Sequence, residues 1–112
     1  EHSPKDPKDI ILKDDDVFIV VTDGSKGSTL YLKDNEVFRP SVENVEVTDS
    51  TGAGDAFAGC FIGALLAGFD HEKALSLATV NGAYACTVFG GLGGVCSFDT
   101  LTEFAKEHNY EL

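Results

Sequence analysis

The chain of 112 residues is long enough for one small domain, and its 43% hydrophobic content is typical of a folded globular protein. It carries 8 basic against 19 acidic residues, a net charge of −11, which excludes a general basic surface for nucleic acid or anionic membranes. The three cysteines lack CxxC spacing and are interpreted as buried, reduced thiols: Cys60, Cys86 and Cys96. The first residues form no signal peptide and no apolar stretch reaches the roughly 18 residues of a membrane span, so we expect a cytoplasmic protein.

An apolar run, Val17–Val21, predicts the first strand. Its lack of alternation is typical of a strand buried on both faces, as in a parallel sheet. Further along, Thr29–Leu32 and Val37–Arg39 alternate apolar and polar residues on either side of a turn at Asp34-Asn35. This pattern predicts a hairpin.

The segment between the first two strands, Thr22–Ser28, holds two glycines that permit a tight turn, Gly24 and Gly27. The side chains in it that could meet a phosphate or a ribose are those of Thr22, Ser25, Lys26 and Ser28. On its residues alone the segment is an ordinary hairpin turn. It is not a Walker A loop, because the order is Lys-Gly-Ser and the glycine spacing is wrong.

The central stretch runs from Asp49 to Phe57, where small residues open directly into an apolar run. Gly52, Ala53 and Gly54 leave their backbone N–H groups unshielded at the start of a helix, and such groups favour an anion. Asp55 follows at once. A carboxylate beside an anion site can accept a proton from a hydroxyl that attacks a phosphoryl group. The alternative is an ordinary acidic residue in the first turn of a helix.

Two buried helices are predicted after this stretch. The first covers the run Phe57–Ala67, which is apolar almost all round and therefore expected to be deeply buried. Gly59 and Gly63 lie on one face of it and are interpreted as close-packing positions. Gly68 is a good residue to end this helix.

Asp70 is a good N-cap for the second helix, predicted over residues 71–88. His71 in its first turn is interpreted as a solvated surface residue. Thr79 and Asn81 interrupt its buried face, and on pattern alone they form a polar stripe.

The remaining chain contains a loop and a short helix. The loop Gly90-Gly91-Leu92-Gly93-Gly94 fails the dinucleotide-binding pattern, because Cys96 replaces the last glycine. A final helix is predicted from Asp99 to His108, with Asp99 or Thr100 as its cap and capping-box spacing between Thr100 and Glu103.

The segment Asp49–Gly59 resembles the second signature of the ribokinase-like (PfkB) family of carbohydrate kinases, and the resemblance extends from about Val17 to Gly94. It implies an α/β chain, the C-terminal part of a three-layer α-β-α fold, with strands and a hairpin followed by buried helices. Residues 1–112 then correspond to the nucleotide-binding and catalytic portion of such a kinase. Nothing in the chain matches the N-terminal portion, which carries the lid and most sugar contacts.

The resemblance also implies roles for single residues. Asp55 would be the catalytic base, and the anion hole would be formed by the amides of Gly52, Ala53, Gly54 and Asp55. Thr22, Gly24 and Gly27 fall in the nucleotide pocket, together with the candidate Lys26. Thr79 matches a position that contacts adenine, and Asn81 is a nearby candidate. A monovalent cation such as K⁺ would be held at Asp49, Thr51, Ala85, Val88, Gly90 and Gly94.

The expected activity is transfer of the γ-phosphoryl group of ATP, with Mg²⁺, to a hydroxyl of a sugar. Alternatives are a nucleoside or vitamin-alcohol kinase of the same superfamily, or a module that binds nucleotide without catalysis. The expected partners are a nucleotide and a small sugar or other small alcohol, with no nucleic acid and no membrane. A chain that lacks most of the central sheet would expose a strand edge and an apolar helix face, so self-association or a missing N-terminal portion is expected.

Overall fold

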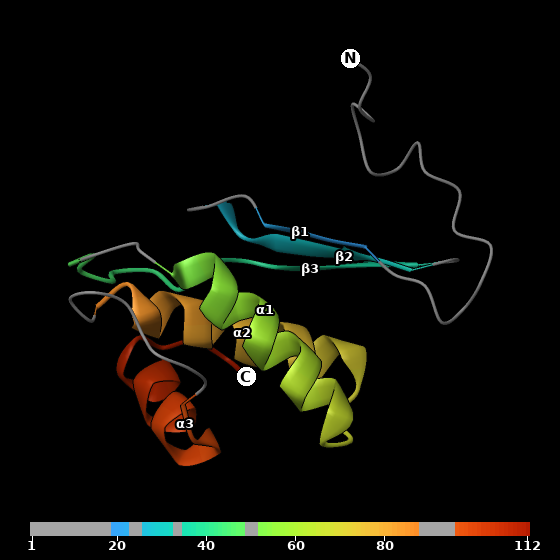
Figure 1. Ribbon diagram of the computed structural model, residues 1–112. Coiled ribbons are helices and arrows are strands. Elements are labelled where there is room, and N and C mark those ends of the chain that lie inside the picture. The colour runs from blue at the N-terminus through green and yellow to red at the C-terminus, as the bar shows by residue number, and fades with distance from the viewer. Residues whose placement is uncertain (1–18, 23–25, 33–34, 49–51, 88–95) are drawn as a thin grey trace. The chain divides into compact units, whose positions relative to one another are not determined.

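The computed structural model describes residues 19–22, 26–32, 35–48, 52–87 and 96–112. Within these ranges the chain forms three strands and then three helices, in the order β1, β2, β3, α1, α2, α3 (Figure 1). The small sheet and the helices agree with the predicted α/β class. The chain divides into two compact units, Glu1–Pro40 with the strands and Ser41–Leu112 with the helices.

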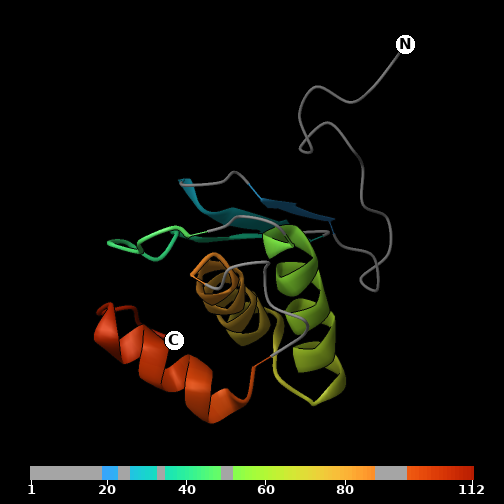
Figure 2. The same ribbon diagram turned by 60° about the vertical axis from the view of Figure 1, so that its left-hand side comes forward.

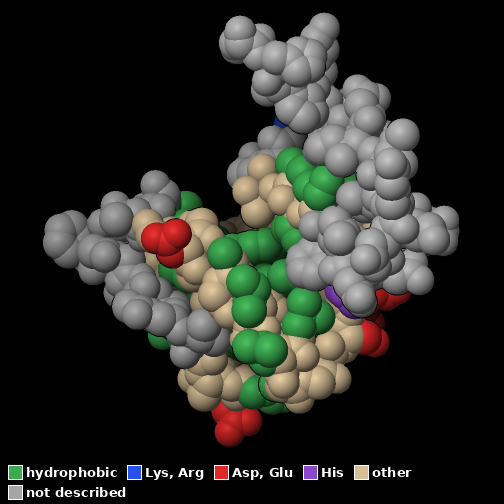
Figure 3. All heavy atoms as spheres, turned by 45° about the vertical axis from the view of Figure 1, so that its right-hand side comes forward, with side chains coloured by type: hydrophobic (Ala, Val, Ile, Leu, Met, Phe, Trp, Pro, Cys, Tyr) green, Lys and Arg blue, Asp and Glu red, His purple; other side chains and the backbone are tan. Residues whose placement is uncertain are grey.

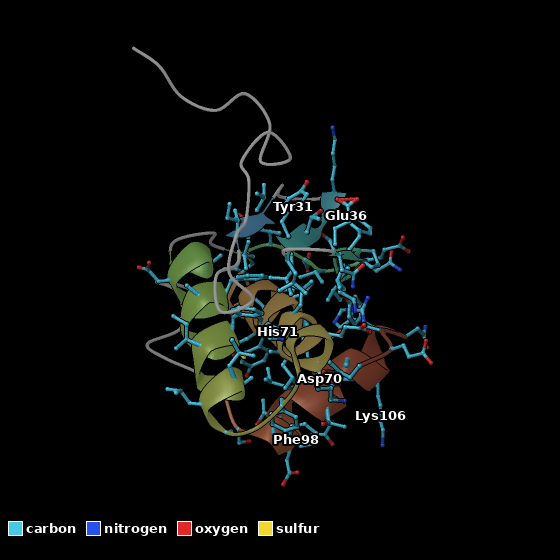
Figure 4. The ribbon with its side chains drawn as sticks, turned by 90° about the vertical axis from the view of Figure 1, so that its right-hand side faces the viewer. Tyr31, Glu36, Asp70, His71, Phe98 and Lys106 are labelled. Atoms are coloured by element: carbon cyan, nitrogen blue, oxygen red, sulfur yellow. The ribbon has the colours of Figure 1, made fainter. Side chains whose placement is uncertain are left out.

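The first unit contains an antiparallel sheet of β1 (Ile19–Thr22), β2 (Ser28–Tyr31) and β3 (Glu36–Arg39), in that order. Tyr31 pairs with Glu36 where β2 turns into β3 (Figure 4). The predicted hairpin is therefore confirmed, because the alternating apolar positions of β2 and β3 fall on the same face in this register.

The prediction of a parallel strand buried on both faces is wrong for the described residues of β1. Ile19, Val20 and Val21 are only half-buried, and β1 pairs with β2 in antiparallel fashion. In the described sheet β1 is an edge strand. A continuous apolar run can thus form an edge strand, which has a hydrogen-bonded neighbour on one side only.

Gly27 is required by the geometry of this sheet. Its φ of +121° lies in a region that side chains rarely adopt. A Cβ atom at Gly27 would also collide with the carbonyl oxygen of Arg39 and approach Cζ of Phe38 to 2.9 Å. The backbone therefore requires a glycine at position 27 whether or not a ligand binds there.

The second unit contains α1 (Ala53–Leu66), α2 (His71–Ala85) and α3 (Phe98–Glu107). Helices α1 and α2 lie side by side, and α3 packs on α2 (Figures 1 and 2). The edge of the Tyr84 ring meets Phe104 with 5.2 Å between centroids, which joins α2 to α3. The large buried side chains of this unit are Phe57, Phe61, Leu75, Leu77, Val80, Leu101 and Phe104.

The predicted signals at the α1–α2 turn are confirmed. Gly68 has a φ of +103°, and the N–H groups of Gly68 and Phe69 donate to the carbonyls of Leu65 and Ala64 at 3.1 and 3.0 Å. This is the Schellman arrangement for a helix end. Asp70 caps α2, because its Oδ1 accepts a hydrogen bond of 2.8 Å from the N–H of Lys73.

The start of α3 rests against this turn. The rings of Phe69 and Phe98 are stacked with centroids 5.9 Å apart, and Nζ of Lys73 lies 5.8 Å from the centroid of Phe98. Figure 4 shows Asp70 and His71 at the start of α2 and Phe98 at the start of α3. The contacts of Phe98 thus connect α3 to α2 and to the turn between α1 and α2.

Two predicted helix boundaries need correction. Helix α2 ends at Ala85 rather than at residue 88. The cap of α3 is Ser97, whose Oγ accepts from the N–H of Thr100 at 3.2 Å, so the prediction of Asp99 or Thr100 is wrong. Thr100 lies three residues inside the cap, and its own hydroxyl pairs with Ser97 Oγ at 3.0 Å. Ser97, Asp99 and Thr100 are all residue types that cap helices well, so the sequence alone does not select between them.

Helix α1 is buried on one side only, so the prediction of deep burial all round is wrong. Its buried positions are Ala56, Phe57, Cys60, Phe61 and Ala64. The opposite side carries Ile62, 55% exposed, and Leu66, 84% exposed. Hydrophobic side chains are visible at the surface in Figure 3. An apolar pattern indicates what a helix can bury, and the described chain supplies a partner for only half of it.

The predicted close packing at Gly63 is not observed among the described residues, because Gly63 is exposed and a Cβ there would meet nothing within 4 Å. Gly59 is also exposed, and its close packing stays a prediction. Of the cysteines, Cys60 is buried as predicted, whereas Cys86 and Cys96 are only half-buried, and all three thiols are free. In the described ranges, no helix is long and apolar enough to cross a membrane.

Candidate functional site

The candidate site is built on the N-terminal end of α1. Gly52, the cap, has a φ of +78° and supplies no side-chain hydrogen bond. The first helical bond runs from the N–H of Ala56 to the carbonyl of Gly52 at 2.9 Å. The N–H groups of Ala53, Gly54 and Asp55 therefore precede the helical ladder and lack a partner within the helix. Together with the helix dipole they can bind an anion.

The space in front of these groups is open among the described residues. A Cβ atom built on Gly52 or on Gly54 would meet nothing within 4 Å. Asp55, in the first turn of α1, is exposed. No described side chain covers either glycine, and the Asp55 side chain is accessible to solvent. This geometry is what the sequence predicts for an anion hole with a base beside it, and the roles themselves stay predictions.

The first turn of α1 faces α2 at Gly82. A Cβ on Gly82 would lie 3.5 Å from the carbonyl oxygen of Ala53 and 3.6 Å from Cβ of Phe57. The sequence analysis missed this glycine. Its signal was present, since a glycine inside a helix costs up to about 1 kcal/mol relative to alanine and therefore often marks close packing.

Asn81 and Thr79, the predicted nucleotide contacts on α2, both lie inside the helical unit. Asn81 is fully buried; its Nδ2 donates to the carbonyl of Ala56 at 2.9 Å, and its Oδ1 accepts from the N–H of Cys96 at 3.1 Å. Thr79 is 7% exposed, and its hydroxyl donates to the carbonyl of Leu75 at 2.8 Å. Contact of either side chain with a nucleotide stays a prediction.

Cys60 lies one helical turn after Ala56 on the buried side of α1. Burial raises the pKa of the Cys60 thiol to about 11, and the nearby Cys96 thiol adds to the shift. Burial also raises the pKa of Cys96. Both thiols are therefore protonated near neutral pH, which makes them poor nucleophiles and poor metal ligands.

A backbone hydrogen bond joins the two segments that are predicted to hold a monovalent cation. The N–H of Thr48 donates to the carbonyl of Cys86 at 2.8 Å. Thr48 directly precedes Asp49, and Cys86 directly follows Ala85, which is fully buried at the end of α2. The other predicted positions lie outside the described residues: Asp49, Thr51, Val88, Gly90 and Gly94. In the described ranges, no group of three or more His, Cys, Asp and Glu residues could hold a metal ion.

The remaining predicted nucleotide contacts belong to the first unit. Thr22 is exposed at the end of β1, opposite Ser28, and Lys26 is also exposed. Gly27 is buried beside Arg39 and Phe38. Gly24 lies outside the described residues.

Comparison with known proteins identifies the family of this chain. Residues 8–95 match the family described as pfkB family carbohydrate kinase. The chain belongs to the pfkB family. The match covers both the hairpin and the helix that follows Gly52, and confirms the resemblance found in the sequence.

Relatives in the pfkB family include kinases for different substrates. The chain is 31% identical to a nucleoside kinase from Methanocaldococcus jannaschii over 90 residues, 80% of this chain and 30% of that protein. It is 36% identical to a deoxyribokinase from Salmonella typhi over 86 residues, 77% of this chain and 27% of that protein. The chain therefore spans less than a third of the length of these relatives.

The fold agrees with solved structures of the ribokinase family. A protein described as a ribokinase II from E. coli, in complex with ATP and Mg²⁺, matches with a TM-score of 0.71 and 31% identity. The match covers 81% of this chain and 29% of that one. The described elements are thus those of a pfkB-family kinase, in a chain of about a third of the length.

Proposed function

We propose that this chain supplies the phosphoryl-transfer site of an ATP-dependent kinase that acts on a hydroxyl of a sugar. The observation that carries the proposal is the N-terminal end of α1, where three N–H groups without a helical partner stand beside the exposed Asp55. Membership of the pfkB family and the ATP and Mg²⁺ bound to the E. coli relative support it.

In the proposed reaction Asp55 accepts the proton of the sugar hydroxyl as that oxygen attacks the γ-phosphorus of ATP. The oxygen–phosphorus bond to the sugar forms, the bond between the γ-phosphorus and the bridging oxygen breaks, and ADP leaves. The N–H groups of Gly52, Ala53, Gly54 and Asp55 donate to the oxygens of the moving phosphoryl group and stabilise its charge. When bound with ATP, Mg²⁺ supplies further positive charge at the phosphates.

The nucleotide would be held by residues that the resemblance assigns to its pocket: Thr22, Gly24, Lys26, Gly27 and Thr79. Asn81, the further candidate of the sequence analysis, already uses both ends of its amide within the chain. A monovalent cation such as K⁺ would lie behind the anion hole, at the backbone carbonyls near Ala85. The hydrogen bond between Thr48 and Cys86 supports this, because it holds the chain next to Asp49 against the end of α2.

A nucleoside is the second candidate for the hydroxyl-bearing substrate. The nucleoside kinase from M. jannaschii supports it, whereas the deoxyribokinase from S. typhi supports a sugar. Asp55 and the amides would act in the same way on a sugar and on a nucleoside, because they contact only the hydroxyl and the phosphoryl group.

The test is ADP release from Mg-ATP, measured with K⁺ present and with a panel of sugars and nucleosides added singly. The proposal predicts release that depends on one class of hydroxyl compound. ATP binding without any substrate-dependent release would contradict it and would favour a nucleotide-binding module without catalysis. Release that depends only on nucleosides would replace the sugar by the second candidate.

A further inference from the structure

Asn81 connects three separate segments of the helical unit. Its Nδ2 donates to the carbonyl of Ala56 in α1 at 2.9 Å, its Oδ1 accepts from the N–H of Cys96 at 3.1 Å, and its backbone lies in α2. The side chain is completely buried. A buried amide with both ends bonded is a costly group to remove, since its partners then lose their hydrogen bonds away from water.

One of the two partners of Asn81 lies in the turn of α1 that would perform catalysis. Ala56 follows Asp55 and donates the first helical bond to Gly52. Cys96 follows the glycine-rich segment, residues 90–94, after one residue. The amide of Asn81 therefore sets the distance between the first turn of α1 and the chain that leaves this segment.

We propose that Asn81 is a positioning residue: by joining Ala56 and Cys96 to α2, it holds the first turn of α1, with Asp55 and the anion-binding amides, in place. This inference rests on the proposed kinase function for its catalytic consequence. It assigns Asn81 a different role from that of a direct nucleotide contact, because the buried amide already uses both its donor and its acceptor groups within the chain.

The hydrogen bond to Ala56 acts where α1 and α2 face each other. Gly82 lies opposite the carbonyl of Ala53 and Phe57, where even an added Cβ would have ordinary contact distances of 3.5 and 3.6 Å. The Asn81–Ala56 hydrogen bond therefore holds the two helices together at this turn. An alanine at position 81 would keep the contact at Gly82 and lose both polar connections.

The experiment compares Asn81→Ala and Asn81→Asp with Asp70→Ala in the full chain. Asp70→Ala removes the cap of α2 and destabilises the same helix far from the first turn of α1. The readouts are amide hydrogen exchange at Cys96, kcat, KM for ATP, and the melting temperature. Hydrogen exchange can be measured without turnover, so it tests the hydrogen bond between Asn81 and Cys96 even if the protein is inactive.

We expect Asn81→Ala to speed exchange at the Cys96 amide about tenfold or more, and to lower kcat about tenfold, with KM for ATP changed less than about threefold. Asp70→Ala should lower the melting temperature with little effect on kcat or on that amide. Unchanged exchange at Cys96 in Asn81→Ala would overturn the proposal. So would an unchanged kcat, or a loss that Asp70→Ala reproduces at equal destabilisation.

Asn81→Asp adds a pH-dependent test. A protonated carboxyl can still donate to the carbonyl of Ala56 and accept from the N–H of Cys96, whereas a carboxylate would face the Ala56 carbonyl with no donor. Burial raises the pKa of a carboxyl, so the protonated form is accessible at mildly acidic pH. The kcat of this variant relative to the unmodified protein should therefore rise as pH falls. A ratio independent of pH would contradict the proposed use of the donor.

The catalytic role of Asp55 and the positioning role of Asn81 can be contradicted independently. If Asp55→Asn retains full turnover, the catalytic assignment fails whatever Asn81 does. If Asp55→Asn abolishes turnover while Asn81→Ala changes neither turnover nor exchange at Cys96, only the positioning role fails.

Discussion

Asn81 and Ala56 are 25 residues apart in sequence, and a buried hydrogen bond of 2.9 Å joins them. It connects the middle of α2 to the first turn of α1, directly after Asp55. The geometry of the candidate site therefore depends on α2 as well as on the glycine-rich turn that precedes α1. The turn residues Gly52, Ala53 and Gly54 do not by themselves fix the direction of α1 relative to α2.

The close contact at Gly82 predicts a difference between two substitutions. Gly82→Ala should be neutral or stabilise the protein by up to about 1 kcal/mol, because its Cβ has ordinary contact distances of 3.5 and 3.6 Å and alanine favours a helix. Gly82→Leu should destabilise the protein by roughly 1–3 kcal/mol, because its branches would press on Ala53 and Phe57. Urea unfolding measures both changes. Equal stability of the two variants would contradict the packing at this position.

The sequence predicted the local features of the site well. The helix start before Asp55, the Gly68 helix end and the Asp70 cap each depend on a few adjacent residues, and all are observed. Asn81 could not be placed in the same way. Its partners lie 25 and 15 residues away, and the pattern along α2 says only that it interrupts an apolar face.

Cys60 predicts a loss of stability at alkaline pH. Burial, with a contribution from Cys96, raises the pKa of the Cys60 thiol from 9.0 to about 11. Between these values the unfolded chain releases the proton and the folded chain keeps it, so the free energy of unfolding falls as pH rises, by up to about 1.4 kcal/mol per pH unit. Below pH 9 the Cys60 thiol is protonated in both states, so it adds no pH dependence to the free energy of unfolding.

The matched measurement is urea unfolding across that range for the unmodified protein, Cys60→Ala and Cys86→Ala. Cys60→Ala should lose part of the alkaline decline, because it removes the titrating group. Cys86→Ala, at a half-buried position, serves as the control. An alkaline decline of the same size in Cys60→Ala and the unmodified protein would contradict the assignment.

The exposed side of α1 predicts self-association through a second copy of the chain. Ile62 and Leu66 are large, apolar and exposed, and burying them against a partner removes apolar surface from water. Leu66→Lys should weaken association in sedimentation velocity over a concentration series. The helix should tolerate this change, since a cation near a helix C-terminus is favourable.

Glu111→Gln changes the net charge by the same amount at an exposed position and is the control for Leu66→Lys. It should leave association unchanged. A protein that is monomeric at every concentration would contradict the prediction, as would equal effects of the two substitutions.

The burial of α1 shows why part of the fold could not be predicted. Its residues are apolar on every side, and the sequence therefore predicts burial on every side. Only Ala56, Phe57, Cys60, Phe61 and Ala64 find partners. What covers a helix depends on other elements, and the chain spans less than a third of the length of its relatives.

The most direct test of the account is Asp55→Asn, compared with Asp99→Asn, in paired measurements of substrate-dependent ADP release and ATP affinity. Both residues are exposed acids in the first turn of a helix, so the pair separates the proposed base from a general charge effect. The account predicts that Asp55→Asn lowers turnover by about 10²-fold or more with ATP affinity nearly unchanged, while Asp99→Asn has no effect. Equal turnover in Asp55→Asn and the unmodified protein would contradict it.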